Sequence, residues 1–107
     1  MGTDRQIEQY LEKCRTYEIV GAYAQTEMAH GSDVSSLMTT ATLDMQTDEF
    51  ILETPNIKSI KFWPGELGLF ATHALVFAQL IIGEKKYGVH SFVVRIRDDN
   101  YKPMPGV

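Results

Sequence analysis

Two segments of the chain carry polar, small and aromatic residues at positions where ordinary turn residues are expected. The first, residues 23–33, leaves a predicted strand and enters a loop, and the second, residues 60–68, contains Trp63, the only tryptophan. Pro64 and Gly65 have the residue types that a type II turn prefers, which predicts an exposed Gly65 N–H beside the tryptophan. Loops of this kind, held by a scaffold of strands, are candidates for a ligand site.

The other side chains with reactive groups indicate no further chemistry. Cys14 is the single cysteine, so it cannot form an internal disulfide, and it has no metal-ligand spacing with His30, His73 or His90. We expect Cys14 to be a small residue facing the core. We expect His30 to form a loop hydrogen bond and not to act as a catalyst, because no nucleophile lies near it in the sequence.

Composition and charge exclude two classes of function. The 107 residues carry a formal net charge of -4, and the longest basic run is the pair Lys85-Lys86, so the chain lacks the charge pattern of a nucleic-acid-binding protein. The longest apolar run, residues 74–82, is too short to span a bilayer. A hydrophobic content of 44% and a charged content of 22% are typical of a single folded domain.

The elements that must position the two segments are one helix and several strands. Thr3 and Gln6 form a predicted capping box, and the apolar residues that follow have helical spacing, which predicts an amphipathic helix over residues 4–15. Its apolar stripe must pack on another surface, because a helix of this length is marginal in isolation.

Alternating and apolar runs predict strands over 37–43, 50–52, 57–63, 73–82 and 87–97. The run 73–82 is apolar on both faces, as expected of a strand covered on both sides, and residues 83–86 predict a hairpin turn. In the last strand, Phe92, Val94 and Ile96 are expected to face the core while Arg95 and Arg97 face solvent. The predicted fold class is mainly β, an antiparallel barrel or sandwich with a short N-terminal helix.

Six sequence blocks, in order, resemble the acyl-CoA oxidases, the oxygen-using branch of the acyl-CoA dehydrogenase superfamily. The family typically carries Tyr-Ala-Gln-Thr-Glu, His-Gly-Ser/Thr, Thr-Thr-Ala-Thr, Ile-Lys-Trp-Trp-Pro-Gly, His-Ala and Ala-Gln-Leu. The corresponding residues here are 23–27, 30–32, 39–42, 60–65, 73–74 and 78–80. Six blocks in the right order are far more specific than any one of them, and they cover nearly the whole chain.

The resemblance implies an FAD site and a substrate site with named residues. Thr26 and Gly65 match the family's FAD contacts, and Trp63 matches the aromatic residue that lies against the flavin ring. Ser32 matches the loop that contacts the acyl-CoA. The resemblance assigns no catalytic residue to this chain: the superfamily's base comes from a later helical domain, which excludes Glu27 from that role. No Gly-x-Gly-x-x-Gly motif supports a Rossmann mode of FAD binding.

Three residues depart from the family pattern. Ala29 stands where glycine is usual, Phe62 where a tryptophan is frequent, and Glu66 where a second glycine is common. Added bulk at 29 and a charge at 66 affect how closely the backbone approaches a ligand.

The resemblance further implies the reaction of the intact protein. A base removes the α-proton of a fatty acyl-CoA while a hydride leaves the β-carbon for the flavin, which gives a trans-2-enoyl-CoA, and O2 is then reduced to H2O2. It also implies a peroxisomal location, a homodimer, an end of a helical domain over 1–17 and a C-terminally truncated middle β-domain over 18–107. The alternatives are a non-catalytic remnant or binding module of the same fold, and a dehydrogenase that passes electrons to a flavoprotein.

Overall fold

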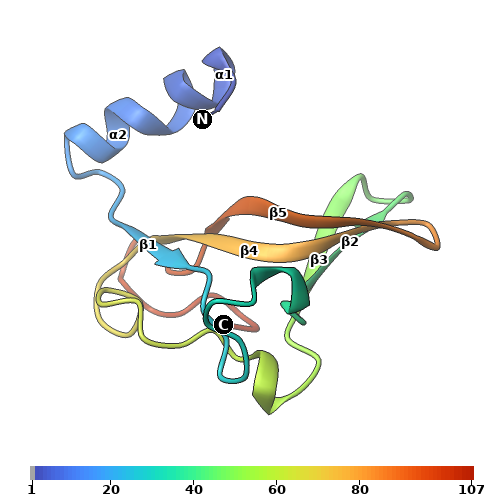
Figure 1. Cartoon of the computed structure of the whole chain (residues 1–107). Helices are drawn as coiled ribbons and strands as arrows, with labels where there is room; N and C mark the ends of the chain where they lie inside the picture. Colours follow the sequence, from blue (N-terminus) through green and yellow to red (C-terminus); the bar gives the residue numbers. More distant parts are fainter. Residues whose placement is uncertain (1) are drawn as a thin grey trace.

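The computed structural model describes residues 2–107, so Met1, the first residue of the predicted unit 1–17, lies outside the described residues. One helical segment precedes a five-stranded sheet, and the long loops after the first and third strands lie on the side of the sheet opposite the helix (Figure 1). The radius of gyration is 14.0 Å. No helix among residues 2–107 is long and apolar enough to cross a membrane.

The predicted helix over 4–15 is confirmed, with one irregular turn in its middle. It consists of α1 (Asp4–Gln6), the π-helical turn η1 (Ile7–Leu11) and α2 (Glu12–Arg15). The capping box is present, because Gln6 N donates to the Thr3 hydroxyl and Thr3 N donates to the Gln6 side chain.

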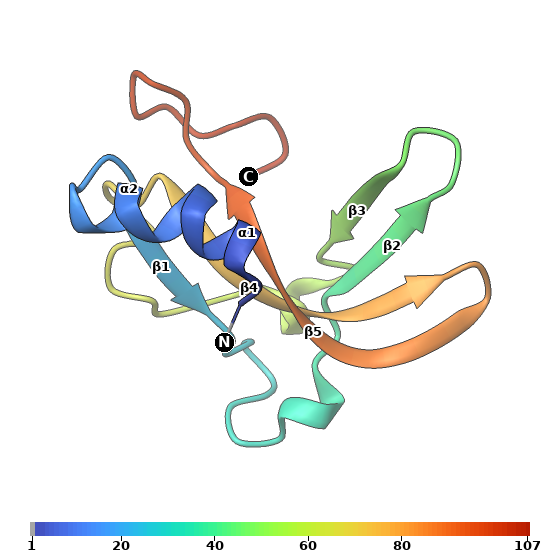
Figure 2. The same ribbon diagram turned by 90° about the horizontal axis from the view of Figure 1, so that it is seen from above.

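The helix does not bury its apolar stripe, and Cys14 is exposed, so the prediction that Cys14 faces the core is wrong. Ile7 remains 44% exposed. The reason is that a groove of about 860 Å³ separates the helix from the sheet, with Leu75 and Val93 on the sheet side. Figure 2 shows the helix crossing over the sheet near β1 and β4.

The sheet is organised around its longest central strand. The strands are β1 (Gly21–Ala24), β2 (Thr40–Asp44), β3 (Glu49–Glu53), β4 (His73–Ile82) and β5 (Lys85–Arg95). β1 and β2 pair in parallel with successive halves of β4, from Gly21↔His73 and from Thr40↔Gln79, while β5 pairs antiparallel with β4. β3 pairs antiparallel with β2 at the edge.

The mainly β prediction is confirmed, but the sheet is mixed and not antiparallel. The physical reason is the crossover over residues 54–72, which carries the chain back to β4 in the same direction as β1 and β2, whereas only the two hairpins reverse it. The strand order β1-β4-β2-β3 leaves the sheet unclosed within residues 2–107.

The hairpin between β4 and β5 follows the sequence prediction, and its loop is shorter than that of the β2–β3 hairpin. Ile82 pairs with Lys85, which leaves Gly83 and Glu84 as a two-residue loop. Gly83 has φ 60° and needs the conformational freedom of glycine for this turn. β4 itself is covered less than predicted, since only Ala74 and Ala78 are buried along it.

Small residues form the core. Ala22, Ala24, Ala71, Ala74 and Ile96 make one buried cluster, against which Leu67, Val76 and Val94 pack. The predicted inward direction of Ile96 is therefore confirmed.

The solvent-facing position predicted for Arg97 is wrong. Its side chain is buried, and its guanidinium donates to the Ala71 carbonyl at 2.7 Å. The alternation of β5 ends at Arg95, so Ile96 and Arg97 are both buried in succession.

Candidate functional site

The two segments singled out in the sequence lie side by side in the structure. Phe62 N donates to the Thr26 carbonyl at 3.2 Å, and Met28 N donates to the Ile60 carbonyl at 3.1 Å. Glu27 and Lys61 form an isolated antiparallel bridge between these bonds. Segment 25–29 therefore runs against segment 58–62, although residues 30–57 separate them in the chain.

The predicted strand over 57–63 is otherwise wrong. Ile57–Ser59 form a 3-10 turn, η3, which is capped by the side chain of Asn56. Pro55 and the capping residue start this turn, and the chain becomes extended only at Ile60, so the pairing with segment 25–29 is short.

A buried carboxylate lies at the centre of the paired segments. The Glu27 side chain is 0% exposed, and its oxygens accept hydrogen bonds from Thr39 N at 2.8 Å, the Thr39 hydroxyl at 2.6 Å and Met38 N at 2.8 Å. Lys61 Nζ adds a charged hydrogen bond at 3.1 Å. These donors come from two further segments of the chain, so Glu27 ties three segments together.

The environment of Glu27 makes it a structural anion and not a proton acceptor. Burial acts to raise its pKa, but the hydrogen bonds from Thr39, Met38 and Lys61 outweigh burial and hold the pKa below the ordinary glutamate value. A carboxylate with a lowered pKa and occupied lone pairs is a poor general base.

Lys61 is the cation that balances this carboxylate, and its side chain is 10% exposed. Besides Glu27, its ammonium donates to the Gln25 carbonyl at 2.9 Å. Burial lowers the pKa of Lys61, and the bonded Glu27 carboxylate acts in the opposite direction. Lys61 and Thr39 were missed in the sequence. Lys61 could have been found by pairing the two segments as short antiparallel strands, because Glu27 and Lys61 then lie opposite each other on one face.

Trp63 presents its side chain to solvent. It is 77% exposed, and its ring stacks on Phe62 with 6.1 Å between centroids and 21° between planes. Its backbone has φ 64°, a left-handed conformation that is unfavourable for a bulky residue. Such an outlier marks a place where surrounding contacts fix the backbone, and it is a frequent feature of functional sites.

The turn at Pro64 differs from the predicted one. Leu67 N donates to the Pro64 carbonyl at 3.2 Å, so Pro64 begins the turn and Gly65 is its second residue. Gly65 has no positive φ, whereas Trp63 does, so the predicted type II turn is wrong. The residue before the proline takes the unusual conformation in place of the glycine. Gly65 is nevertheless exposed beside Trp63, and nothing lies within 4 Å of where its Cβ would stand.

Ser32 is exposed in the loop that follows Glu27. Glu27 and His30 exchange backbone hydrogen bonds, with Glu27 N to the His30 carbonyl at 3.0 Å and His30 N to the Glu27 carbonyl at 3.2 Å, which close the loop. The His30 ring contacts Glu27 Oε2 at 3.5 Å through Nδ1. The structure bonds Thr26 to Phe62, the residue before Trp63, and Ser32 lies exposed in the loop that follows Glu27.

The residues that depart from the family pattern lie within or next to the two paired segments. Phe62 supplies the ring under Trp63, and Ala29 N bonds to the Lys58 carbonyl at 3.0 Å. The Glu66 side chain is exposed while its carbonyl accepts from Ala71 N at 3.0 Å. None of the three substitutions interrupts the pairing of the two segments.

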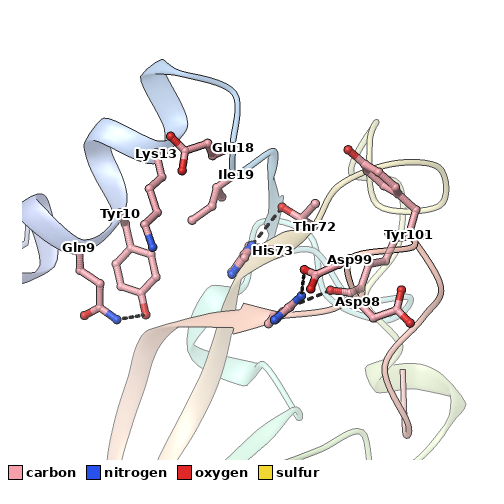
Figure 3. Close-up of a pocket in the computed structure, with 12 residues that line it drawn as sticks. Gln9, Tyr10, Lys13, Glu18, Ile19, Thr72, His73, Asp98, Asp99 and Tyr101 are labelled. Carbon is pink, nitrogen blue, oxygen red and sulfur yellow. Dashed lines mark hydrogen bonds and ion pairs between the residues drawn. The ribbon is translucent and has the colours of Figure 1, made fainter.

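A separate pocket of about 440 Å³ lies between the helix and the adjoining ends of β4 and β5 (Figure 3). Lys13, His73 and Arg95 lie on its wall, and the His73 ring is hydrogen-bonded to the Thr72 hydroxyl at 3.0 Å. Burial and then the charges of Arg95 and Lys13 lower the pKa of His73. Thr26, Trp63 and Gly65 do not line this pocket, so the predicted flavin residues lie outside it. Residues 2–107 contain no group of three or more His, Cys, Asp or Glu side chains arranged to hold a metal ion.

Comparison with solved structures identifies the class first. The chain superimposes on an acyl-CoA oxidase from tomato (Lycopersicon esculentum) with a TM-score of 0.96 and 51% identity over 98% of this chain and 16% of that one. It superimposes on acyl-CoA oxidase-1 of Caenorhabditis elegans, complexed with FAD and ATP, with a TM-score of 0.95 and 45% identity over 98% of this chain and 16% of that one. The chain therefore has the fold of one segment of the acyl-CoA oxidases.

Comparison in sequence gives the same result. The chain is 50% identical over 107 residues to the peroxisomal acyl-coenzyme A oxidase 1 of Bos taurus, which covers 99% of this chain and 16% of that protein. No protein-family model matches the chain. The predicted resemblance to acyl-CoA oxidases is confirmed, and the chain spans about a sixth of the length of the relatives that it matches.

Proposed function

We propose that this chain is the central β-domain segment of a flavin-dependent acyl-CoA oxidase and carries half of its FAD and fatty acyl-CoA site. The observation that carries this proposal is the pairing of segment 25–29 with segment 58–62, which sets Thr26 beside the aromatic pair Phe62 and Trp63. The relatives are named as acyl-CoA oxidases, and the structure from Caenorhabditis elegans is described as a complex with FAD.

The residues present fit a flavin. An isoalloxazine ring is flat and largely apolar, with polar atoms at its edge, and it needs an aromatic or aliphatic face together with hydrogen-bond donors. Trp63 offers an exposed flat face, supported from behind by Phe62. Gly65 offers an uncrowded backbone, and Thr26 offers a hydroxyl one residue from the buried anchor Glu27.

Each residue has a role that follows from its position. Trp63 would lie against a bound flavin ring and exclude water from it, while the Gly65 N–H and the Thr26 hydroxyl would donate to its polar edge. When bound, FAD would supply the capacity to accept the hydride that leaves the β-carbon of a fatty acyl-CoA while a base removes its α-proton, which yields a trans-2-enoyl-CoA, and to pass two electrons to O2 with formation of H2O2. Ser32, exposed in the loop after Glu27, would contact the acyl-CoA.

The remainder of the site comes from outside this segment. We propose that residues 1–17 are the end of a helical domain, that 18–107 belong to a middle β-domain whose sheet closes into a barrel in the intact protein, and that the base lies in a later domain. The exposed apolar residues Ile60, Leu69 and Phe70, close to Trp63 in the sequence, indicate a surface that another domain or subunit covers, and we propose a homodimer in which a second subunit completes the site. The relatives' names support a peroxisomal location.

Titration of the chain with FAD tests the proposed half-site. Trp63 is the only tryptophan, so quenching of its fluorescence reports on this surface alone. We expect FAD to quench the Trp63 fluorescence saturably, and we expect Thr26→Ala to bind FAD more weakly. Binding should also change the flavin absorbance, and Trp63→Phe should show a smaller change of the same kind. Absence of binding by a folded chain would refute the half-site in residues 1–107 and would support the alternative of a non-catalytic scaffold.

A further inference from the structure

The bonds around Lys61 enclose Thr26 from both sides. Its ammonium donates to the carbonyl of Gln25, the residue before Thr26, and to the carboxylate of Glu27, the residue after it. The carbonyl of Thr26 itself accepts from Phe62 N, next to Lys61. Three consecutive residues of one segment are thus held by two consecutive residues of the other.

The direction of Glu27 determines the direction of Thr26. In an extended segment successive side chains point to opposite faces, so a Glu27 side chain that is buried requires the Thr26 side chain to point away from the interior. The same rule places Lys61 inward and Phe62 outward, in agreement with the burial of Lys61 and the exposure of Phe62. A shift of one residue in this pairing would bury Thr26 and expose Glu27.

A buried ion pair of this kind contributes more to selecting one register of the two segments than to overall stability. A buried pair gains little over an apolar pair of the same shape, because both charges lose their hydration. The pair does disfavour every register in which one of the two charges is buried without the other. In the observed register the Glu27 carboxylate also accepts hydrogen bonds from Met38 N and Thr39 N.

We propose that Glu27 and Lys61 are positioning residues for the flavin half-site: their buried ion pair fixes the register of segments 25–29 and 58–62, and so presents Thr26 on the same outward face as Phe62, the ring on which Trp63 stacks. This inference rests on the proposed function for the ligand involved, but its structural part is tested without the ligand.

Lys61→Met is the informative variant. It keeps the length of the side chain and its burial, and it leaves Glu27 with the three hydrogen bonds from Thr39 and Met38. Lys61→Arg keeps the charge and is the conservative rescue. Arg15→Met is the matched control, because it removes a cation from an exposed ion pair with Glu12 on the helix.

Two measurements separate positioning from overall stability. The first is amide hydrogen exchange, comparing Phe62 and Met28, which bridge the two segments, with the amides of the β4–β5 hairpin. The second is the affinity for FAD. We expect Lys61→Met to lose protection at Phe62 and Met28 while the hairpin keeps it, and to bind FAD about tenfold more weakly, the factor that one charged hydrogen bond represents. Lys61→Arg recovers most of both, and Arg15→Met changes neither.

Two other outcomes would overturn the inference, and a third would separate it from the proposed function. Unchanged exchange at Phe62 and Met28 in Lys61→Met would show that the pair does not set the register. Loss of protection across the whole sheet would assign the pair to general stability. If the unaltered chain does not bind FAD while Lys61→Met still loses protection only at the bridging amides, the proposed function fails and the positioning role stands.

Discussion

Removal of the Glu27 carboxylate tests the account of the buried cluster. Glu27→Ala leaves Lys61 as a buried cation without its partner, and it leaves Met38 N and Thr39 N without an acceptor. Breaking a buried ion pair by removing one partner costs about 3–5 kcal/mol. A domain of this size is stable by roughly 5–15 kcal/mol, so the loss is a large part of the total.

Urea unfolding followed by circular dichroism measures this loss. With a slope of about 2 kcal/mol per molar urea, the midpoint falls by about 2 M. Glu53→Ala is the matched control, since Glu53 is an exposed strand glutamate and its replacement changes stability by only about 0.5 kcal/mol. A loss below about 1 kcal/mol in Glu27→Ala would refute the reasoning, because it would mean that Lys61 and the two amides find water or other partners.

Two further predictions concern the same surface. Because the pKa of Glu27 is lower in the fold than in the unfolded chain, its contribution is fully present above the ordinary glutamate pKa of about 4.3 and disappears as the pH falls through the lower folded pKa. We therefore expect the free energy of unfolding of Glu27→Gln to vary less with pH in this acid range than that of the unaltered chain, measured by urea unfolding at a series of pH values, and parallel curves would contradict this. Trp63→Gly removes an exposed side chain from a left-handed backbone position, so we expect thermal unfolding to show a stability within about 1 kcal/mol of the unaltered chain while FAD binding is lost. A strongly destabilised Trp63→Gly would show that the indole packs within the fold.

The sequence was sufficient for elements with strong periodicity and characteristic end residues. The helix over 4–15, its capping box and the β4–β5 hairpin all follow from local patterns, because Thr3 and Gln6 favour a helix start and Gly83 favours a tight turn. The direction of β1 and β2 relative to β4 could not be predicted in this way. It depends on the path of the crossover 54–72, and local periodicity carries no information about it.

The candidate site shows the same division. Sequence blocks identified both segments, which meet at Thr26 and Phe62, but the buried side of this pairing depends on contacts between residues 27, 39 and 61, which are far apart in the chain. Residue types alone also misplaced the turn by one residue, because proline and glycine favour a type II turn with Trp63 first, whereas the structure turns over 64–67 and has the positive φ at Trp63. The burial of Arg97 was hidden for a similar reason, since its partner is the carbonyl of Ala71, twenty-six residues away.

The most direct test of the central claim is a map of FAD binding by amide NMR on the labelled chain. We expect saturating FAD to shift the Trp63 indole N–H and the amides of segments 25–29 and 60–66, and to leave Lys13, His73 and Arg95 around the other pocket unchanged. Shifts centred on that other pocket, or no shifts in a chain with a folded spectrum, would contradict the claim that Thr26, Trp63 and Gly65 form the flavin half-site.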